Sequence, residues 1–67
     1  MNKFPEKLKE IRMERNLSQR TLAKEIGFSQ ASIARWEAGL QIPNIDVVIK
    51  FATYFKVSTD YLLGLDN

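Results

Sequence analysis

The sequence has 67 residues, so we expect residues 1–67 to form one small domain with a thin apolar core. It contains no cysteine, no histidine and no apolar run long enough to span a membrane, so we expect no disulfide, metal, cofactor or membrane anchor, and a cytoplasmic location. The net charge of +2 is uneven: residues 1–35 carry eight Lys/Arg and four Asp/Glu, residues 36–67 carry two and four, and a polyanion would prefer the first part.

The first predicted element is a helix that starts near Pro5, because the fixed φ of proline suits the first helical position. Phe4 is expected just before this helix, and its end is expected around Asn16. Leu8, Ile11 and Arg15 are spaced to lie along one side. Leu17 is then predicted to fill the core between two elements.

Two short helices follow, because apolar residues recur at helical spacing between polar capping residues and glycines. Ser18 is the predicted N-cap of the second helix, and Gly27 is its predicted stop. Ser29 is the predicted N-cap of a third helix, residues 30–38, which Gly39 ends. A connector, residues 40–43, comes next.

The last part of the chain predicts two more helices, which Asn44 and Ser58 cap. The fifth helix ends at Leu63, before Gly64, and residues 65–67 form a tail. The inward stripe of the fourth helix is predicted from its spacing to be Ile45, Val48, Ile49, Ala52 and Phe55. No strand pattern is present, so the predicted fold is all-α with five helices.

The second and third helices predict a compact bihelical unit, residues 18–38, because only a few residues around one glycine join them. Ile33 and Trp36 fall on one face of the third helix. The opposite face is small and free of acidic residues, and its members are Gln30, Ala31, Ala34 and Arg35. Alanines allow a close approach to DNA, and Gln and Arg match the hydrogen-bonding edges of adenine and guanine. The alternative is an ordinary amphipathic helix with an idle outer face.

These residues also carry a family resemblance that covers nearly the whole chain and all five expected helices. The pattern consists of Leu17-Ser18-Gln19, Leu22-Ala23, Gly27, Phe28-Ser29, Ser32-Ile33, Trp36-Glu37, Gly39, Pro43, Phe51-Ala52, Phe55, Val57-Ser58 and Tyr61-Leu62. It resembles the lambda-repressor-like (Cro/XRE) helix-turn-helix family. The resemblance implies a compact five-helix DNA-binding domain.

The resemblance implies base-contacting roles on the third helix, at Gln30, Ala31, Ala34 and Arg35. We expect Gln30 to pair with an adenine, Arg35 with a guanine, and Ala31 to meet a thymine methyl group. The aromatic residues around this helix, Trp36 and Phe28 among them, are interpreted as core with Phe51 and Phe55.

Phosphate contacts are implied at the helix starts, where the positive helix terminus favours an anion. The expected set is Arg12, Ser18, Gln19, Ser29, Ser32 and Asn44. For Gln19 the alternative is a polar residue that merely begins a helix. Arg20 and Lys24 on the second helix either face phosphates or form an ordinary solvated surface.

Arg12 and Glu37 are similar to a pair that members of this family often join as a partly buried ion pair. The alternative is two solvated surface charges, which contribute roughly 0–1 kcal/mol. Removing one partner of a buried pair leaves a poorly solvated charge, so the two readings predict different effects on stability.

The connector departs from the family pattern because it lacks basic residues, so we expect a modest electrostatic contribution and micromolar binding by a single domain. Leu40 and Ile42 are predicted to be exposed apolar residues. They suggest a dimer interface with Val47, Tyr54, Tyr61 and Leu65 as its candidates; Leu62, in contrast, is interpreted as core.

The sequence therefore favours a sequence-specific regulator of transcription, a repressor that binds double-stranded DNA as a homodimer at a palindromic operator. Repression is expected because nothing in the sequence beyond the DNA-binding domain would sense a ligand or recruit polymerase. The alternative is an antitoxin-like protein-interaction module that uses the apolar surface of the fourth and fifth helices. No enzyme is predicted, because the chain lacks His, Cys and a glycine-rich phosphate loop and has no room for a deep pocket.

Overall fold

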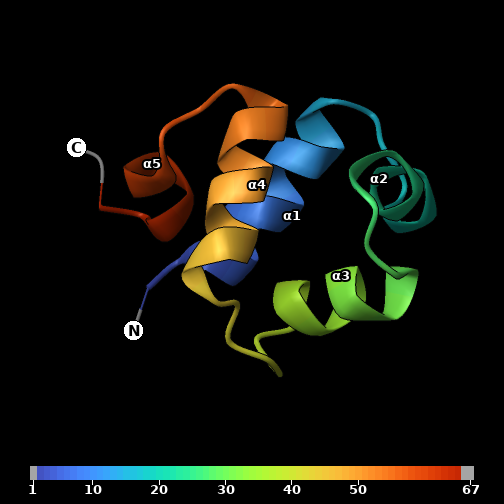
Figure 1. Ribbon diagram of the computed structural model, residues 1–67, viewed down its shortest axis with the longest axis horizontal. Helices are drawn as coiled ribbons and strands as arrows, with labels where there is room; N and C mark the ends of the chain where they lie inside the picture. Colours follow the sequence, from blue (N-terminus) through green and yellow to red (C-terminus); the bar gives the residue numbers. More distant parts are fainter. Residues whose placement is uncertain (1, 66–67) are drawn as a thin grey trace.

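The computed structural model describes residues 2–65 and contains five helices in this part of the chain. Their bounds are α1 (Phe4–Glu14), α2 (Gln19–Ile26), α3 (Gln30–Glu37), α4 (Ile45–Phe55) and α5 (Thr59–Leu63). Figure 1 shows α1 and α4 at the centre, α2 and α3 on one side, and α5 on the other. The predicted all-α fold with five helices is confirmed. No helix among residues 2–65 is long and apolar enough to cross a membrane.

The predicted N-caps of the last four helices are confirmed, because each side-chain oxygen accepts a hydrogen bond from a backbone N–H three residues later. The caps are Ser18, Ser29, Asn44 and Ser58. The first helix starts differently: it begins at Phe4, which lies inside the helix, and Asn2 Oδ1 accepts a hydrogen bond from its N–H (3.0 Å). It also ends earlier than predicted, at Glu14, because Asn16 adopts a left-handed conformation (φ 57°).

The core is centred on the fully buried ring of Phe51. Its centroid lies 5.9 Å from that of Phe4, 5.4 Å from Phe28 and 5.7 Å from Trp36, so one side chain of α4 joins α1 to the bihelical unit. The prediction that Trp36, Phe51 and Phe55 belong to the core is confirmed, and Phe28, which was predicted with them, is partly buried and packs against it. Leu62 of α5 is also fully buried.

The predicted inward stripe of α4 is partly wrong. Ile45 is 61% exposed and Ile49 is 46% exposed, whereas Val48, Ala52 and Phe55 are buried together with Phe51. This helix carries two overlapping stripes of apolar residues. The stripe that contains the large Phe51 ring faces the core. The consequence is that two isoleucines remain on the surface of α4.

Candidate nucleic-acid interface

The turn between α2 and α3 is short and rigid. Gly27 ends α2 in a left-handed conformation (φ 87°), and its N–H donates to the Ala23 carbonyl (2.9 Å). Phe28 then packs its ring edge-on against Trp36, with 5.0 Å between the centroids. Aromatic contact between the turn and α3 therefore fixes the angle at which α3 leaves α2.

The outer face of α3 is accessible as predicted. Gln30, Ala31 and Arg35 are exposed and Ala34 is half-buried. On the opposite face Ile33 and Trp36 are buried. The helix therefore presents small and polar groups outward while its apolar side is packed into the core.

Arg35 does not extend freely into solvent. Its Nε donates a hydrogen bond to Gln41 Oε1 in the connector (2.9 Å), and its Nη2 lies 3.4 Å from Ser32 Oγ on the preceding turn of α3. Nothing in the sequence pattern indicated that the connector would contact this side chain.

Ser18, Ser29 and Asn44 lie exposed at the first turns of α2, α3 and α4, where backbone N–H groups have no partner within the helix. Their side-chain oxygens are engaged as caps, at 3.0 Å from the Thr21 N–H in the case of Ser18. Phosphate contacts at these sites would thus depend on hydroxyl or amide donors and on the exposed N–H groups beside them.

The predicted ion pair between Arg12 and Glu37 is present and joins α1 to the end of α3. Arg12 Nε lies 2.6 Å from Glu37 Oε2, and Nη2 donates to Oε1 (3.1 Å). The Arg12 side chain is only 12% exposed and that of Glu37 only 4% exposed. The remaining terminal nitrogen of Arg12, Nη1, donates to the Leu17 carbonyl (2.7 Å), so each guanidinium nitrogen has a partner within the chain.

Gln19 completes this buried polar junction, because its Nε2 donates to Glu37 Oε1 (3.1 Å). We call Arg12, Gln19 and Glu37 the polar junction. Of the residues predicted to contact phosphate, the structure thus directs two side chains, those of Arg12 and Gln19, to Glu37. The backbone N–H of Gln19 lies in the first turn of α2, next to the cap Ser18.

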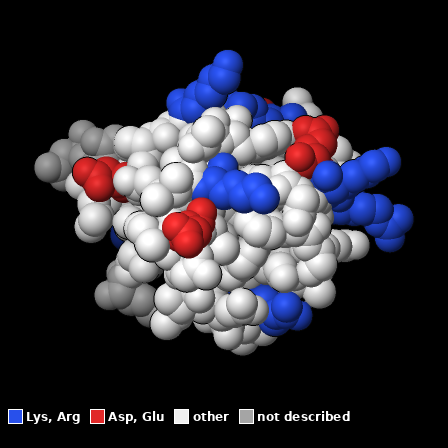
Figure 2. All heavy atoms as spheres, viewed as in Figure 1, with Lys and Arg blue, Asp and Glu red and all other residues white. Residues whose placement is uncertain are grey.

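Basic side chains project from the edge of the molecule over α2, with one group of acidic atoms beside them, and another acidic group lies at the opposite edge near α5 (Figure 2). Arg20 and Lys24 are both exposed on α2. Within the part of the chain that the structure describes, the two ion pairs are Lys7–Glu10 and Arg12–Glu37, and neither involves these two residues. The end of the molecule that carries α2 is therefore the one that would attract an anion.

The candidates for a dimer interface differ in exposure. Leu65 is 65% exposed, but Val47, Tyr54 and Tyr61 are half-buried and pack against the core. Lys7 Nζ lies over the Tyr61 ring, 5.1 Å from its centroid.

The apolar residues that the sequence reasoning missed are Ile45 and Ile49 on α4. They are exposed, as are Leu40 and Ile42 in the connector that leads into α4. We call Ile45 and Ile49, which lie one turn apart on α4, the isoleucine face. The large ring of Phe51 in the same helix was the signal: it favours burial of its own stripe, and Ile45 and Ile49 are then exposed.

Tyr54 makes a polar contact between α4 and α2. Its hydroxyl donates a hydrogen bond to Glu25 Oε1, and its ring packs edge-on against Phe55 at 5.0 Å. The hydrogen bond to Glu25, followed by burial and the carboxylate charge, raises the pKa of Tyr54 above its usual value of 10.0. This side chain therefore stays neutral at physiological pH and fixes the outer side of α2.

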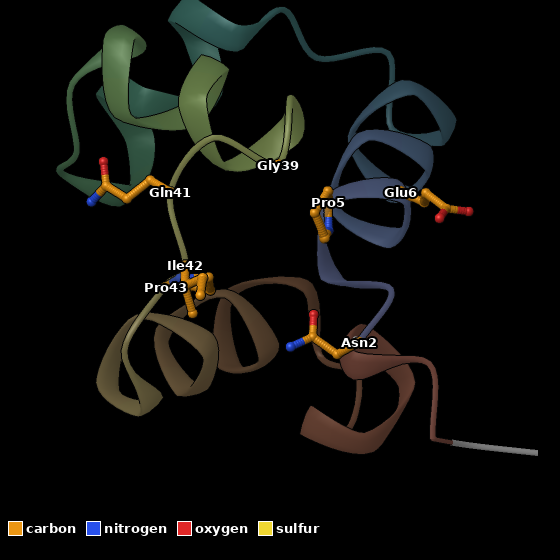
Figure 3. Close-up of a pocket in the computed structure, with 7 residues that line it drawn as sticks. All are labelled: Asn2, Pro5, Glu6, Gly39, Gln41, Ile42 and Pro43. Carbon is orange, nitrogen blue, oxygen red and sulfur yellow. The ribbon is translucent and has the colours of Figure 1, made fainter.

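An open pocket of about 330 Å³ separates the connector from the start of α1. It is lined by Asn2, Pro5, Glu6, Gly39, Gln41, Ile42 and Pro43 (Figure 3). The side chain of Gln41 leaves the connector on the side opposite to Pro5. The connector is thus separated by this space from α1, while Gln41 contacts α3 through Arg35.

This arrangement of two helices, a glycine turn and a small outer face is shared with a known family. The sequence profile of the helix-turn-helix family (HTH_3) matches residues 8–62. The chain belongs to this family. The match includes α2 and α3 entirely, and the lambda-repressor-like resemblance of the sequence is confirmed.

Relatives of this helix-turn-helix chain are regulators of transcription. It is 36% identical over 61 residues to the HTH-type transcriptional activator BcrR of Enterococcus faecalis, a match that covers 91% of this chain and 30% of BcrR. It is 31% identical over 61 residues to the HTH-type transcriptional regulator ImmR of Bacillus subtilis, covering 91% of this chain and 48% of ImmR. The chain thus spans half or less of the length of these two relatives.

A solved structure with the same fold is the P22 c2 repressor in complex with a synthetic operator. The TM-score is 0.85 at 27% sequence identity, and the match covers 98% of this chain and 100% of the repressor chain. The similarity therefore extends over all five helices and includes the orientation of α3 relative to α2.

Proposed function

We propose that this helix-turn-helix chain is a sequence-specific regulator of transcription that binds double-stranded DNA, with α3 in the major groove. The observation that carries the proposal is the outer face of α3, where Gln30, Ala31 and Arg35 are exposed on a helix whose other face is fixed in the core. The likeness to the P22 c2 repressor, whose structure was solved with an operator, supports the same use of α3.

Direct reading of bases would be divided among the residues of this face. Gln30 pairs with an adenine and Arg35 with a guanine, each contact discriminating by about 1–3 kcal/mol, while Ala31 meets a thymine methyl group. Ala34 is half-buried and small, which lets the helix approach the base edges closely.

Phosphate contacts would place α3 in the groove. We assign them to the exposed helix starts, at Ser18, Ser29 and Asn44, to Ser32, and to the backbone N–H of Gln19. Arg12 is left out of this set because its guanidinium is engaged with Glu37 and Leu17. Because the connector is uncharged, a single domain is expected to bind with micromolar affinity and a shallow salt dependence.

A two-fold dimer would present two recognition helices roughly 34 Å apart and would require a palindromic operator. We propose that a second copy covers the isoleucine face, together with the exposed Leu65. The half-burial of Val47, Tyr54 and Tyr61 makes these residues secondary contributors. Replacing Ile45 and Ile49 by Gln should lower dimer content in sedimentation experiments without changing the melting temperature of the monomer.

We propose repression in the cytoplasm as the biological role, because occupying an operator requires only the binding surface described above. We propose no catalytic role for this chain.

A second candidate function is an antitoxin-like interaction with another protein, which the exposed isoleucine face favours. The two functions differ in the residues that they require. If Ile45 and Ile49 are essential in cells while Gln30 and Arg35 are dispensable, the protein-interaction function is correct.

The direct test is selection of bound sequences from a random duplex pool at about 100 mM salt, repeated at higher salt. We expect an inverted repeat whose enrichment is lost with Gln30→Ala and with Arg35→Ala. The exposed Glu10→Ala variant on α1 is the matched control. No enrichment at either salt concentration would contradict DNA reading.

A further inference from the structure

The connector is folded back against the end of α3 by a Schellman motif. The Leu40 N–H donates to the Arg35 carbonyl (2.9 Å), and the Gly39 N–H donates to the Trp36 carbonyl (3.2 Å). Gly39 adopts the left-handed conformation that this motif requires (φ 73°). The backbone of the connector is therefore attached to the same residue, Arg35, that is assigned to base reading.

A side-chain hydrogen bond also joins the connector to α3. Gln41 Oε1 accepts a hydrogen bond from Arg35 Nε (2.9 Å), and both residues are exposed. Gln41 is neutral, and Arg35 belongs to neither of the ion pairs found among residues 2–65. The contact thus orients the guanidinium without neutralising its charge.

The choice of nitrogen matters for recognition. Guanine presents two acceptors, O6 and N7, that a guanidinium contacts with two N–H groups at once. Nε is bonded to Gln41 and one N–H of Nη2 faces Ser32 Oγ at 3.4 Å, which leaves the second N–H of Nη2 and both N–H groups of Nη1 for the two acceptors of a guanine. An unrestrained arginine loses conformational entropy of its long side chain when it binds a base. The contact with Gln41 already restricts the side chain, so less conformational entropy is lost on binding.

We propose that Gln41 is a specificity-positioning residue: by accepting from Arg35 Nε it orients the guanidinium for end-on contact with a guanine. This inference rests on the proposed function. In this proposal the uncharged connector contributes to recognition because Gln41 orients Arg35, not because the connector contacts a phosphate.

The test uses the operator obtained from the selection experiment and the same duplex with 7-deazaguanine, which lacks N7, at the base that depends on Arg35. The measured quantity is the dissociation constant for the 7-deazaguanine duplex divided by that for the unmodified operator. We expect Gln41→Met, which keeps the length of the side chain but removes the acceptor, to lower this ratio about fivefold. Gln41→Glu keeps an acceptor, so it should retain the ratio while weakening binding to both duplexes.

Arg35→Ala provides the matched background. There the ratio should be close to one, and adding Gln41→Met should change it no further. The melting temperatures of the Gln41 variants should equal that of the original chain, because both residues of the contact are exposed.

Two results would overturn the inference while leaving the proposed function intact. One is an unchanged ratio with Gln41→Met, which includes an equal loss of affinity for both duplexes, as expected of a phosphate contact. The other is an increased ratio with Gln41→Met, which would show that the contact masks Arg35. Failure of the original chain to enrich any sequence would overturn the proposed function and this inference together.

Discussion

Two arginines of similar chemistry have opposite environments in this molecule. Arg12 lies in the polar junction, 12% exposed, with a carboxylate and a carbonyl as its partners. Arg35 lies on the surface of α3, bonded only to neutral groups of Gln41 and Ser32. Burial and the charge of the partner therefore decide the role of each arginine: Arg12 fixes helices relative to one another, and Arg35 keeps its charge available.

Breaking the polar junction should have the largest effect. Glu37→Ala leaves the partly buried Arg12 guanidinium without its carboxylate and should lower the free energy of unfolding by about 3–5 kcal/mol. Arg12→Lys keeps a charge near Glu37 and should cost less. Urea denaturation measures both, with Glu10→Ala in the surface pair Lys7–Glu10 (3.8 Å) as the control that should cost at most about 1 kcal/mol. A coupling near zero in a double-mutant cycle of Arg12 and Glu37 would contradict this account.

The exposed arginine should show the opposite pattern. Arg35→Ala should leave the free energy of unfolding within about 0.5 kcal/mol of its original value, because the side chain is exposed. It should instead reduce discrimination between the operator and a mismatched duplex by about 1–3 kcal/mol, as measured by fluorescence anisotropy. If Arg35→Ala destabilised the fold as much as Glu37→Ala, the distinction between the two arginines would fail.

The backbone at the end of α3 can be altered without replacing either arginine. Gly39→Ala must adopt φ 73°, which costs an alanine about 1–2 kcal/mol, while the added methyl group would lie an ordinary 3.9 Å from Pro5 Cγ. We expect this loss of stability in thermal unfolding, with the strain confined to the backbone. Gly39→Asn should cost less because asparagine tolerates the left-handed region better, and equal losses for both variants would argue against backbone strain as the cause.

The smallest effect concerns pH and the contact between Tyr54 and Glu25. The pKa of Tyr54 is raised in the folded chain, so the unfolded chain loses this proton at a lower pH than the folded chain does. The stabilising contribution is therefore complete below pH 10 and decreases as the pH rises through the folded pKa. Tyr54→Phe should remove this decrease, and identical stability profiles of the two proteins above pH 10 would contradict the prediction.

Local chemistry was predictable from the sequence. The caps at Ser18, Ser29, Asn44 and Ser58 depend on bonds between residues three positions apart, so the sequence specifies them without knowledge of the tertiary fold. The outer face of α3 was predictable for the same reason, because helical periodicity alone separates Arg35 from Trp36.

Features that depend on tertiary packing were harder to predict from the sequence. On α4 nearly every position except those of Asp46, Lys50 and Thr53 is apolar, so periodicity permits two inward faces, and packing of Phe51 against three other aromatic rings selects one. The contact between Gln41 and Arg35 depends on how the chain reverses at Gly39. Both are long-range or turn-dependent outcomes that spacing along one helix does not encode.

DNA reading by α3 is tested most directly by an NMR titration of the ¹⁵N-labelled protein with the duplex enriched by selection. We expect the largest shift changes at Gln30, Ala31 and the Arg35 Nε resonance, with smaller changes at the first turns of α2 and α4. The amide of Glu37, which belongs to the polar junction, should shift least among those of α3. Shift changes confined to the isoleucine face and α5, with α3 unaffected, would contradict the claim that α3 reads DNA.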